Sequence, residues 1–180
     1  MCIRDSAKTP VGFDGAVWEL LLPFVTGATV VAAADGDHRD PRHLARLIGE
    51  YAVTTTVFVP SLLELFVDHL AGLPSLRHII AGGEALPAAL ARRVGAAAPG
   101  VSLINAYGPT ETTVVVTDRL ADPTVTGPTV PIGRPVAGTE LLVLDESLRR
   151  VPDGVTGELY VRGIPVTRGY LGRPDLTAAA

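Results

Sequence analysis

Apolar residues recur at helical spacing in the first part of the chain. A helix is predicted for residues 14–27, because four apolar residues recur there at i, i+3, i+4 and i+7: Val17, Leu20, Leu21 and Phe24. Asp14 stands where a side chain can cap the first turn, and Gly27 can close the last one. This segment is therefore predicted to be an amphipathic helix with its apolar side against a core.

Short apolar runs rich in β-branched residues alternate with such helices up to about residue 107. Strands are predicted at 28–33, 54–59, 77–83 and 101–107. Three further helices are expected to begin at Pro41, Pro60 and Pro87, since proline suits the first turn of a helix. Strands that alternate with helices predict the α/β class, with a parallel sheet flanked by helices.

The pattern changes after residue 110. Residues 112–117, 139–145 and 157–163 are apolar or alternating, with no helical pattern between them, and residues 121–138 are a loop rich in Pro and Gly. We expect an α/β subdomain at 7–112 and a mostly antiparallel, barrel-like β subdomain at 113–180. The first six residues, MCIRDS, resemble a translated sequencing adapter and are set aside from the fold as an artefact of assembly.

Composition limits the classes of function. With 47% hydrophobic residues, the chain can bury one sizeable core, and a net charge of -4 argues against a nucleic-acid partner. No apolar run is long enough to span a bilayer, no secretory signal is present, and Cys2 has no second cysteine to pair with. We predict a cytoplasmic protein that binds a small molecule or another protein and does not bind a membrane.

The segment NAYGPTETT, Asn105–Thr113, combines several ligand-binding groups at the end of a predicted strand. Open α/β sheets bind ligands at the carboxyl ends of their strands. There Tyr107 can stack on a purine, Thr110 can bond phosphate oxygens and Glu111 can hold magnesium. The alternative is a plain Gly-Pro turn followed by a helix cap.

This segment resembles the signature of adenylate-forming enzymes, and in particular of the amino-acid adenylation domains of nonribosomal peptide synthetases. Three other segments resemble motifs of that family in the expected order: FDGAVWELLLPFVTGATVV at 13–31, RHIIAGGEAL at 77–86 and GELYVRGIPVTRGYLGRPDLT at 157–177. The resemblance extends over residues 7–180.

The resemblance implies a two-step reaction. An amino-acid carboxylate attacks the α-phosphate of ATP to give aminoacyl-AMP and pyrophosphate, with Mg²⁺ offsetting phosphate charge. The acyl group then passes to the phosphopantetheine thiol of a peptidyl carrier protein, in an assembly line that also contains a condensation domain. A bacterial secondary-metabolite pathway is the expected setting.

The resemblance also implies roles for the nucleotide-binding residues. Thr110 and Glu111 are the expected catalytic pair, with Thr110 contacting phosphate and Glu111 holding the metal. Tyr107 is expected to stack on adenine. The remaining residues expected to line the ATP or AMP site are Gly82, Gly83, Glu84, Asn105 and Gly108.

A substrate pocket is implied in the same way. Asp14 corresponds to the aspartate that pairs with the substrate α-ammonium group, although its role from position alone is a helix cap. The other implied lining residues are Gly15, Trp18, Val57, Ile80, Gly82, Ala106, Val114 and Val115. None of these eight is charged, so an apolar or aromatic amino acid is the expected substrate.

Some parts of the family site have no counterpart in the sequence. The phosphate loop would precede residue 7, and the ribose-binding aspartate and catalytic lysine would follow residue 180, so the chain is expected to be an internal fragment without activity of its own. Two alternatives stay open: an acyl-CoA or aryl-acid ligase of the same superfamily, and a non-catalytic α/β module that binds a nucleotide.

Overall fold

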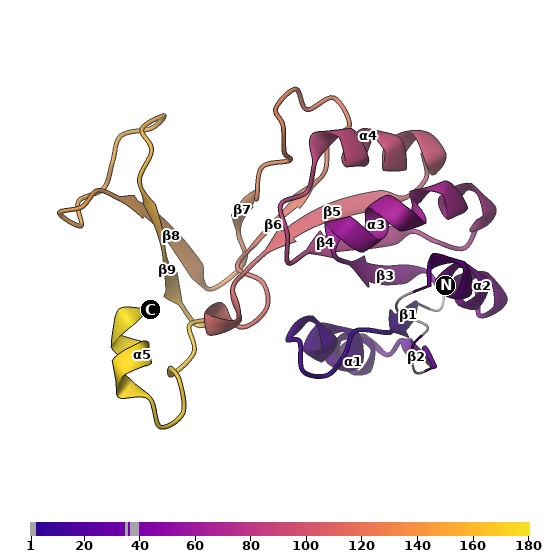
Figure 1. Cartoon of the computed structure of the whole chain (residues 1–180), viewed down its shortest axis with the longest axis horizontal. Helices are drawn as coiled ribbons and strands as arrows, with labels where there is room; N and C mark the ends of the chain where they lie inside the picture. The colour runs from indigo at the N-terminus through magenta and orange to yellow at the C-terminus, as the bar shows by residue number, and fades with distance from the viewer. Residues whose placement is uncertain (1–2, 35, 37–39) are drawn as a thin grey trace.

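A computed structural model describes residues 3–34, 36 and 40–180, so Met1 and Cys2 of the set-aside segment lie outside the described residues. Among these residues, seven strands form one sheet in the order β2-β1-β3-β4-β5-β6-β7. They are β1 (Arg4–Ala7), β2 (Thr29–Ala32), β3 (Thr55–Phe58), β4 (His78–Gly82), β5 (Ser102–Tyr107), β6 (Thr117–Leu120) and β7 (Arg134–Pro135). The first five strands are parallel, whereas β6 and β7 run antiparallel (Figure 1).

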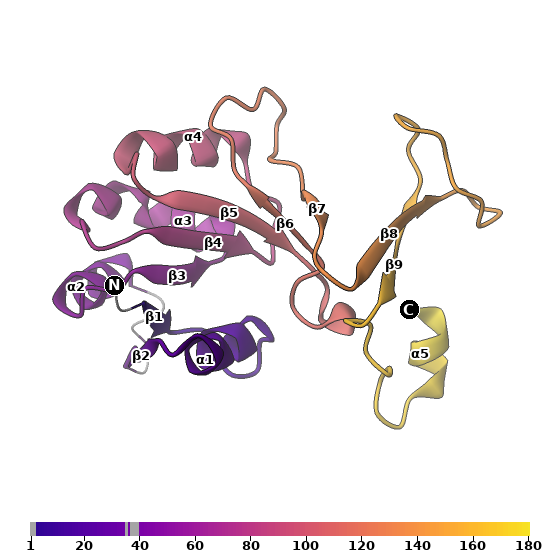
Figure 2. The same cartoon turned by 180° about the vertical axis from the view of Figure 1, so that it is seen from behind.

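The strand order reverses next to β1. The chain passes from β1 outward to β2 and then returns to the other side of β1 to form β3, β4 and β5. Because parallel crossovers are right-handed, this reversal places the first helix on one face of the sheet and the later helices on the other. Figures 1 and 2 show α1 (Gly15–Thr26) on the opposite side of the sheet from α3 (Pro60–Phe66) and α4 (Ala88–Ala97). The predicted α/β class with a parallel sheet flanked by helices is confirmed.

The main core lies between the sheet and the helices of the second face. α2 (Pro41–Glu50) begins at the predicted proline, and the Asp40 side chain caps it by accepting a hydrogen bond from the Arg42 N–H. α3 continues into a 3₁₀ helix, η2 (Val67–Gly72). The largest buried apolar side chains are Leu44, Ile48, Phe58, Leu63, Phe66, Leu76, Ile79, Leu86 and Leu90.

The first strand corrects one expectation. Residues 4–6, set aside above as an artefact, are part of β1 and pair with Thr29–Val31 of β2. The prediction that the fold begins after residue 6 is therefore wrong. The foreign origin of residues 1–6 stays a prediction.

Helix α1 has the predicted bounds, with Gly27 as a left-handed cap at φ 67°. However, its apolar side is exposed: Val17 is 47%, Leu21 56% and Phe24 75% accessible. The predicted amphipathic helix is present, but its apolar side does not face the core of the described chain. The inner side of α1 carries Gly15, Ala16, Glu19 and Pro23 instead.

The second half of the chain departs from the expected division at residue 112. The strand predicted at 112–117 is wrong, because Thr110–Thr112 form a 3₁₀ turn, η3, and β6 begins only at Thr117. Strands β6 and β7 extend the first sheet. Only β8 (Thr139–Leu144) and β9 (Glu158–Gly163) form a second, antiparallel sheet, which projects away from the first one and is followed by α5 (Pro174–Ala179) (Figure 1). Within the described residues, no helix combines the length and apolar character that crossing a membrane requires.

Candidate active site

A cavity of about 340 Å³ opens at the carboxyl ends of the parallel strands. Its walls come from the residues that follow β1, from the start of α1, and from the ends of β3, β4 and β5. This is the position beside the reversal of strand order at which open α/β sheets bind ligands. All nine implied pocket residues line the cavity: Asp14, Gly15, Trp18, Val57, Ile80, Gly82, Ala106, Val114 and Val115.

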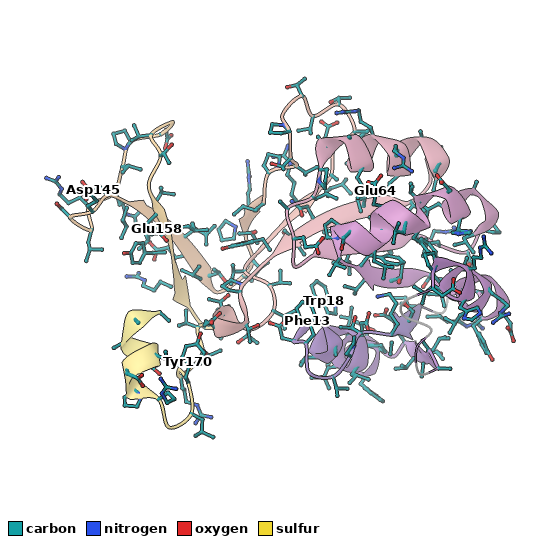
Figure 3. All side chains as sticks on the ribbon, in the orientation of Figure 1. Phe13, Trp18, Glu64, Asp145, Glu158 and Tyr170 are labelled. Carbon is teal, nitrogen blue, oxygen red and sulfur yellow. The ribbon has the colours of Figure 1, made fainter. Side chains whose placement is uncertain are left out.

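Other residues also line the cavity, and the family resemblance did not assign them to the substrate pocket. They include Lys8, Thr9, Pro10, Phe13, Phe58, Val59, Leu62, Gly83 and Gly108. Figure 3 shows Phe13 and Trp18 at the beginning of α1, on the side that faces the strand ends. The expected lining contained no charged residue besides Asp14, so Lys8 is an addition with chemical consequences. Lys8 precedes the first family motif, so the resemblance gave it no role.

Asp14 stands at the N-cap position of α1, but its side chain makes no capping hydrogen bond. Its backbone is itself helical, with φ -64° and ψ -22°, whereas a capping residue usually has an extended backbone. The Oδ2 atom is buried without a hydrogen-bond partner among the described residues. The predicted capping role of Asp14 is therefore wrong. A buried carboxylate oxygen without a partner is costly, so this atom is suited to receive a donor from a ligand.

Lys8 and Glu19 form a buried ion pair next to this wall of the cavity. The Lys8 Nζ lies 3.1 Å from Glu19 Oε1, with side chains only 4% and 1% accessible. Glu19 Oε2 also accepts the backbone N–H groups of Lys8 and Thr9, at 2.8 and 2.7 Å. The Lys8 ammonium lies 4.8 Å from the centre of the Phe58 ring. Burial lowers the pKa of Lys8, and the neighbouring Glu19 opposes this shift.

The turn that closes the cavity is unusually tight. Thr113 and Val114 have φ angles of 58° and 71°, which are uncommon for β-branched residues. A side chain at Gly108 would place its Cβ 2.5 Å from the Val114 carbonyl oxygen and 2.8 Å from the Val115 Cα. Glycine at 108 therefore lets the strand end and the turn approach each other, which brings Val114 and Val115 to the cavity.

A second hollow adjoins the first and shares Gly83, Ala106 and Gly108 with it. Its other lining residues include Glu84, Asn105, Tyr107, Thr129, Val130 and Ile132. Of the residues expected at the nucleotide site, five line this hollow and Gly82 lines the first cavity, whereas Thr110 lines neither; the five are Gly83, Glu84, Asn105, Tyr107 and Gly108.

Two polar side chains at the second hollow have partners within the protein. The Asn105 side-chain amide is buried and donates to the carbonyls of Val130 and Pro131, both at 3.1 Å, which ties the 128–132 loop to β5. Glu84 accepts the Ser61 N–H and the Ser61 hydroxyl, both at 2.9 Å. The Glu84 carboxylate thus holds the first turn of α3 in place, and its orientation is set by that contact.

Glu111 lies in η3 and is bound by the segment that follows β9. Its carboxylate accepts a short hydrogen bond from the Tyr170 hydroxyl, and its backbone carbonyl accepts the Thr167 N–H at 2.8 Å. Thr113 donates its hydroxyl to the Pro165 carbonyl at 2.7 Å. The hydrogen bond from Tyr170 lowers the pKa of Glu111, which keeps the carboxylate ionised. Figure 3 shows Tyr170 on the segment beside α5.

Glu111 fits a magnesium ligand of the kind that ATP brings with it. Among the described residues, no three acidic, histidine or cysteine side chains come together to hold a metal without help. Mg²⁺ commonly takes only one or two protein carboxylates and completes its shell with phosphates and water. One ionised carboxylate is as much as such a coordination requires of the protein, although Glu111 lines neither of the two hollows.

Comparison with known proteins establishes the family. Residues 6–171 match the family of AMP-binding enzymes. Over 174 residues the chain is 49% identical to phosphinothricin tripeptide synthetase PhsB of Streptomyces viridochromogenes, and over 184 residues it is 46% identical to enterobactin synthase component F of Escherichia coli K12. These alignments cover 95% and 96% of the chain but only 14% of each relative.

Solved structures agree with the family match. The fold superposes on holo-PA1221, a nonribosomal peptide synthetase protein with adenylation and PCP domains, with a TM-score of 0.91 and 30% identity over 99% of this chain and 32% of that one. It also superposes on the AMPPNP-bound form of the nonribosomal peptide synthetase FmoA3, with a TM-score of 0.90 and 32% identity over 99% of this chain and 20% of that one. The chain therefore belongs to the AMP-binding enzyme family, and its predicted resemblance to peptide-synthetase adenylation domains is confirmed.

Proposed function

We propose that this chain forms the amino-acid and nucleotide sites of an adenylation domain that activates an apolar or aromatic amino acid as aminoacyl-AMP. The observation that carries the proposal is the unpartnered Oδ2 of Asp14 in an otherwise mostly apolar cavity. An α-ammonium group would supply both the positive charge and the hydrogen bond that this oxygen lacks. A carboxylic acid without an amine would leave the oxygen buried and unpaired.

The rest of the cavity favours an uncharged side chain. Val57, Ile80, Ala106 and Val114 have hydrocarbon side chains, and Lys8, the one cation among the described lining residues, is already paired with Glu19. A charged substrate side chain would lose water without gaining a free partner, at a cost of several kcal/mol. Trp18 and Phe13 add aromatic surface, which suits a branched aliphatic or aromatic group.

The adjoining hollow is the proposed adenine site. Tyr107 offers a ring face, and Asn105 is held in one orientation by its two bonds to the 128–132 loop. Gly83 and Gly108 lie where the two hollows meet, so the α-phosphate of ATP and the substrate carboxylate would meet there. Thr110 would contact phosphate oxygens, and Glu111 would hold Mg²⁺, which offsets phosphate charge when bound.

The transfer of the acyl group to a carrier-protein phosphopantetheine thiol completes the proposal. The neighbour holo-PA1221 contains a PCP domain next to its adenylation domain, which supports a carrier protein as the partner. A condensation domain of the same assembly line is the further proposed partner.

Amino-acid-dependent exchange of pyrophosphate into ATP tests the proposed function. The chain spans 14% of the curated relatives, so the test uses the complete adenylation domain that contains it. Exchange is expected with one or more of L-leucine, L-valine and L-phenylalanine. It is expected to be much weaker with 4-methylpentanoate, 3-methylbutanoate and 3-phenylpropanoate, which lack the amine, and absent for the 180 residues alone.

The same assay separates the alternatives. An acyl- or aryl-acid ligase would use the acids as well as the amino acids or better. A nucleotide-binding module without turnover would bind ATP and give no exchange with either set. Either outcome would refute the amino-acid adenylation proposal.

The magnesium role of Glu111 has its own test. Glu111→Gln in the complete domain is expected to raise the Mg²⁺ concentration needed for half-maximal exchange on the order of tenfold, because an amide is a weaker ligand than a carboxylate. Calorimetric titration of ATP at several Mg²⁺ concentrations should show the same shift. Glu146→Gln, on the exposed turn between β8 and β9, is the matched control and should change neither value.

A further inference from the structure

The position of the amine anchor depends on how α1 is attached to the sheet. Four residues of α1 are buried, and three of them, Gly15, Ala16 and Pro23, are small or lack a long side chain. The fourth, Glu19, is 1% accessible and is among the largest fully buried side chains of the described chain. Five large apolar residues of the helix, which would normally attach it to a core, are exposed instead: Val17, Leu20, Leu21, Phe24 and Val25.

Glu19 therefore supplies the specific contact between α1 and the segment after β1. One carboxylate accepts three hydrogen bonds, from Lys8 N, Thr9 N and Lys8 Nζ. The chain then turns at Phe13, whose N–H donates to the Pro10 carbonyl at 2.9 Å, and enters α1 at Asp14. Residues 8–19 thus form a closed loop with Asp14 on the cavity side and Glu19 at the base.

The geometry of α1 explains how the Glu19 contact can affect the position of Asp14. Asp14 and Trp18 are four residues apart and line the cavity together with Gly15, whereas Glu19 does not line it and is buried against the segment after β1. A rotation or shift of α1 about the Glu19 contact would displace the Asp14 carboxylate and the Trp18 ring together. Misplacement by about 1 Å can cost as much as a hundredfold in rate at a site that depends on orientation.

We infer that Glu19, held by Lys8 and Thr9, is a positioning residue that sets the place of Asp14 and thereby the preference for a substrate with an α-amine. The inference rests on the proposed function, since it assigns Glu19 a part in that specificity. Glu19 does not touch the substrate in this arrangement, because it does not line the cavity.

Selectivity for the amine is the measurement that separates positioning from stability. In the complete domain, Glu19→Ala is expected to lower the ratio of kcat/KM for L-leucine, L-valine or L-phenylalanine to kcat/KM for the matching des-amino acid by about tenfold. The KM for the amino acid should rise, while the KM for ATP stays within about twofold, since the nucleotide hollow lies on other elements. Lys8→Met, which keeps both backbone hydrogen bonds to Glu19, should give a smaller loss in the same direction.

A matched control excludes a general effect of destabilisation. Leu44→Ala removes a fully buried side chain of α2, remote from the cavity lining, and should lower Tm without changing the selectivity ratio. If the ratio is unchanged in both Glu19→Ala and Lys8→Met while the wild type is selective, the positioning role is refuted and the proposed function stands. If the wild type shows no preference for the amine, the proposed function fails and the positioning role fails with it. Should Glu19→Ala not fold, Lys8→Met decides the question.

Discussion

Replacing Asp14 by asparagine in the complete adenylation domain should lower kcat/KM for the amino acid about a hundredfold or more. The Oδ2 atom is buried without a partner among the residues that the structure describes, so the substrate ammonium group would be its main source of charge compensation. Removing one member of a buried charge pair costs about 3 to 5 kcal/mol, which corresponds to this loss. Pyrophosphate exchange with the amino acid and with its des-amino analogue measures the effect.

The loss should be confined to the amine. Exchange with the des-amino acid should fall little or even rise, and ATP affinity should be nearly unchanged, because Tyr107, Thr110 and Glu111 do not line the cavity that contains Asp14. Glu64→Gln serves as the control, since it breaks only an exposed ion pair with Arg93. A fall of less than about fivefold for Asp14→Asn, or equal preferences in both proteins, would mean that the carboxylate does not bind the amine.

Local sequence patterns were sufficient for four of the five parallel strands, β2 to β5, but not for β1. Runs of β-branched residues alternate there with helices that begin at Pro41 and Pro60. This pattern depends on strand propensity and on proline at the first helical turn, and both effects act within a few residues. The strand predicted at 112–117 failed for a different reason. Its Thr and Val residues favour a strand, but the close approach of Gly108 to Val114 imposes left-handed backbone angles that local propensity does not reveal.

In the candidate site, too, some residues could be predicted from the sequence, whereas others depend on contacts between distant residues. The nine cavity residues could be assembled from the family resemblance, although they come from the start of α1, from three strands and from the turn before β6. Lys8 could not, since its role depends on burial against Glu19 and Phe58, which lie 11 and 50 residues away. The exposure of the apolar side of α1 was not predicted either. An apolar stripe on a helix indicates that another segment covers it, but it does not indicate which segment.

Asp5 is the residue least suited to its surroundings in the structure, and its replacement is the second substitution for which we expect a large effect. It lies in β1 inside the sheet, is 1% accessible, and its Oδ1 has no hydrogen-bond partner in the described part of the chain. Burial, followed by the charge of Glu19, raises its pKa to about 7, while Lys8 acts in the opposite direction. The same carboxyl lines a small apolar cavity beside Leu22 and His78. Interior strands of parallel sheets are usually apolar, so a carboxyl at this position is unfavourable.

Asp5→Val should therefore stabilise the chain, and more so at high pH. The folded state holds the Asp5 proton more tightly than the unfolded state, so the free energy of unfolding of the wild type should fall as pH rises from about 4 to 7 and level off above that. The gain from the valine should be larger at pH 8 than at pH 4 by up to about 4 kcal/mol, the equivalent of a shift of about three pKa units. Urea unfolding of both proteins between pH 4 and 8 measures the difference.

Asp5→Asn should also remove this pH dependence but stabilise less, because the amide stays polar, and Asp153→Asn on the exposed turn should behave as wild type. A difference between Asp5→Val and wild type that does not change with pH would show that Asp5 is ionised in the folded protein throughout this range.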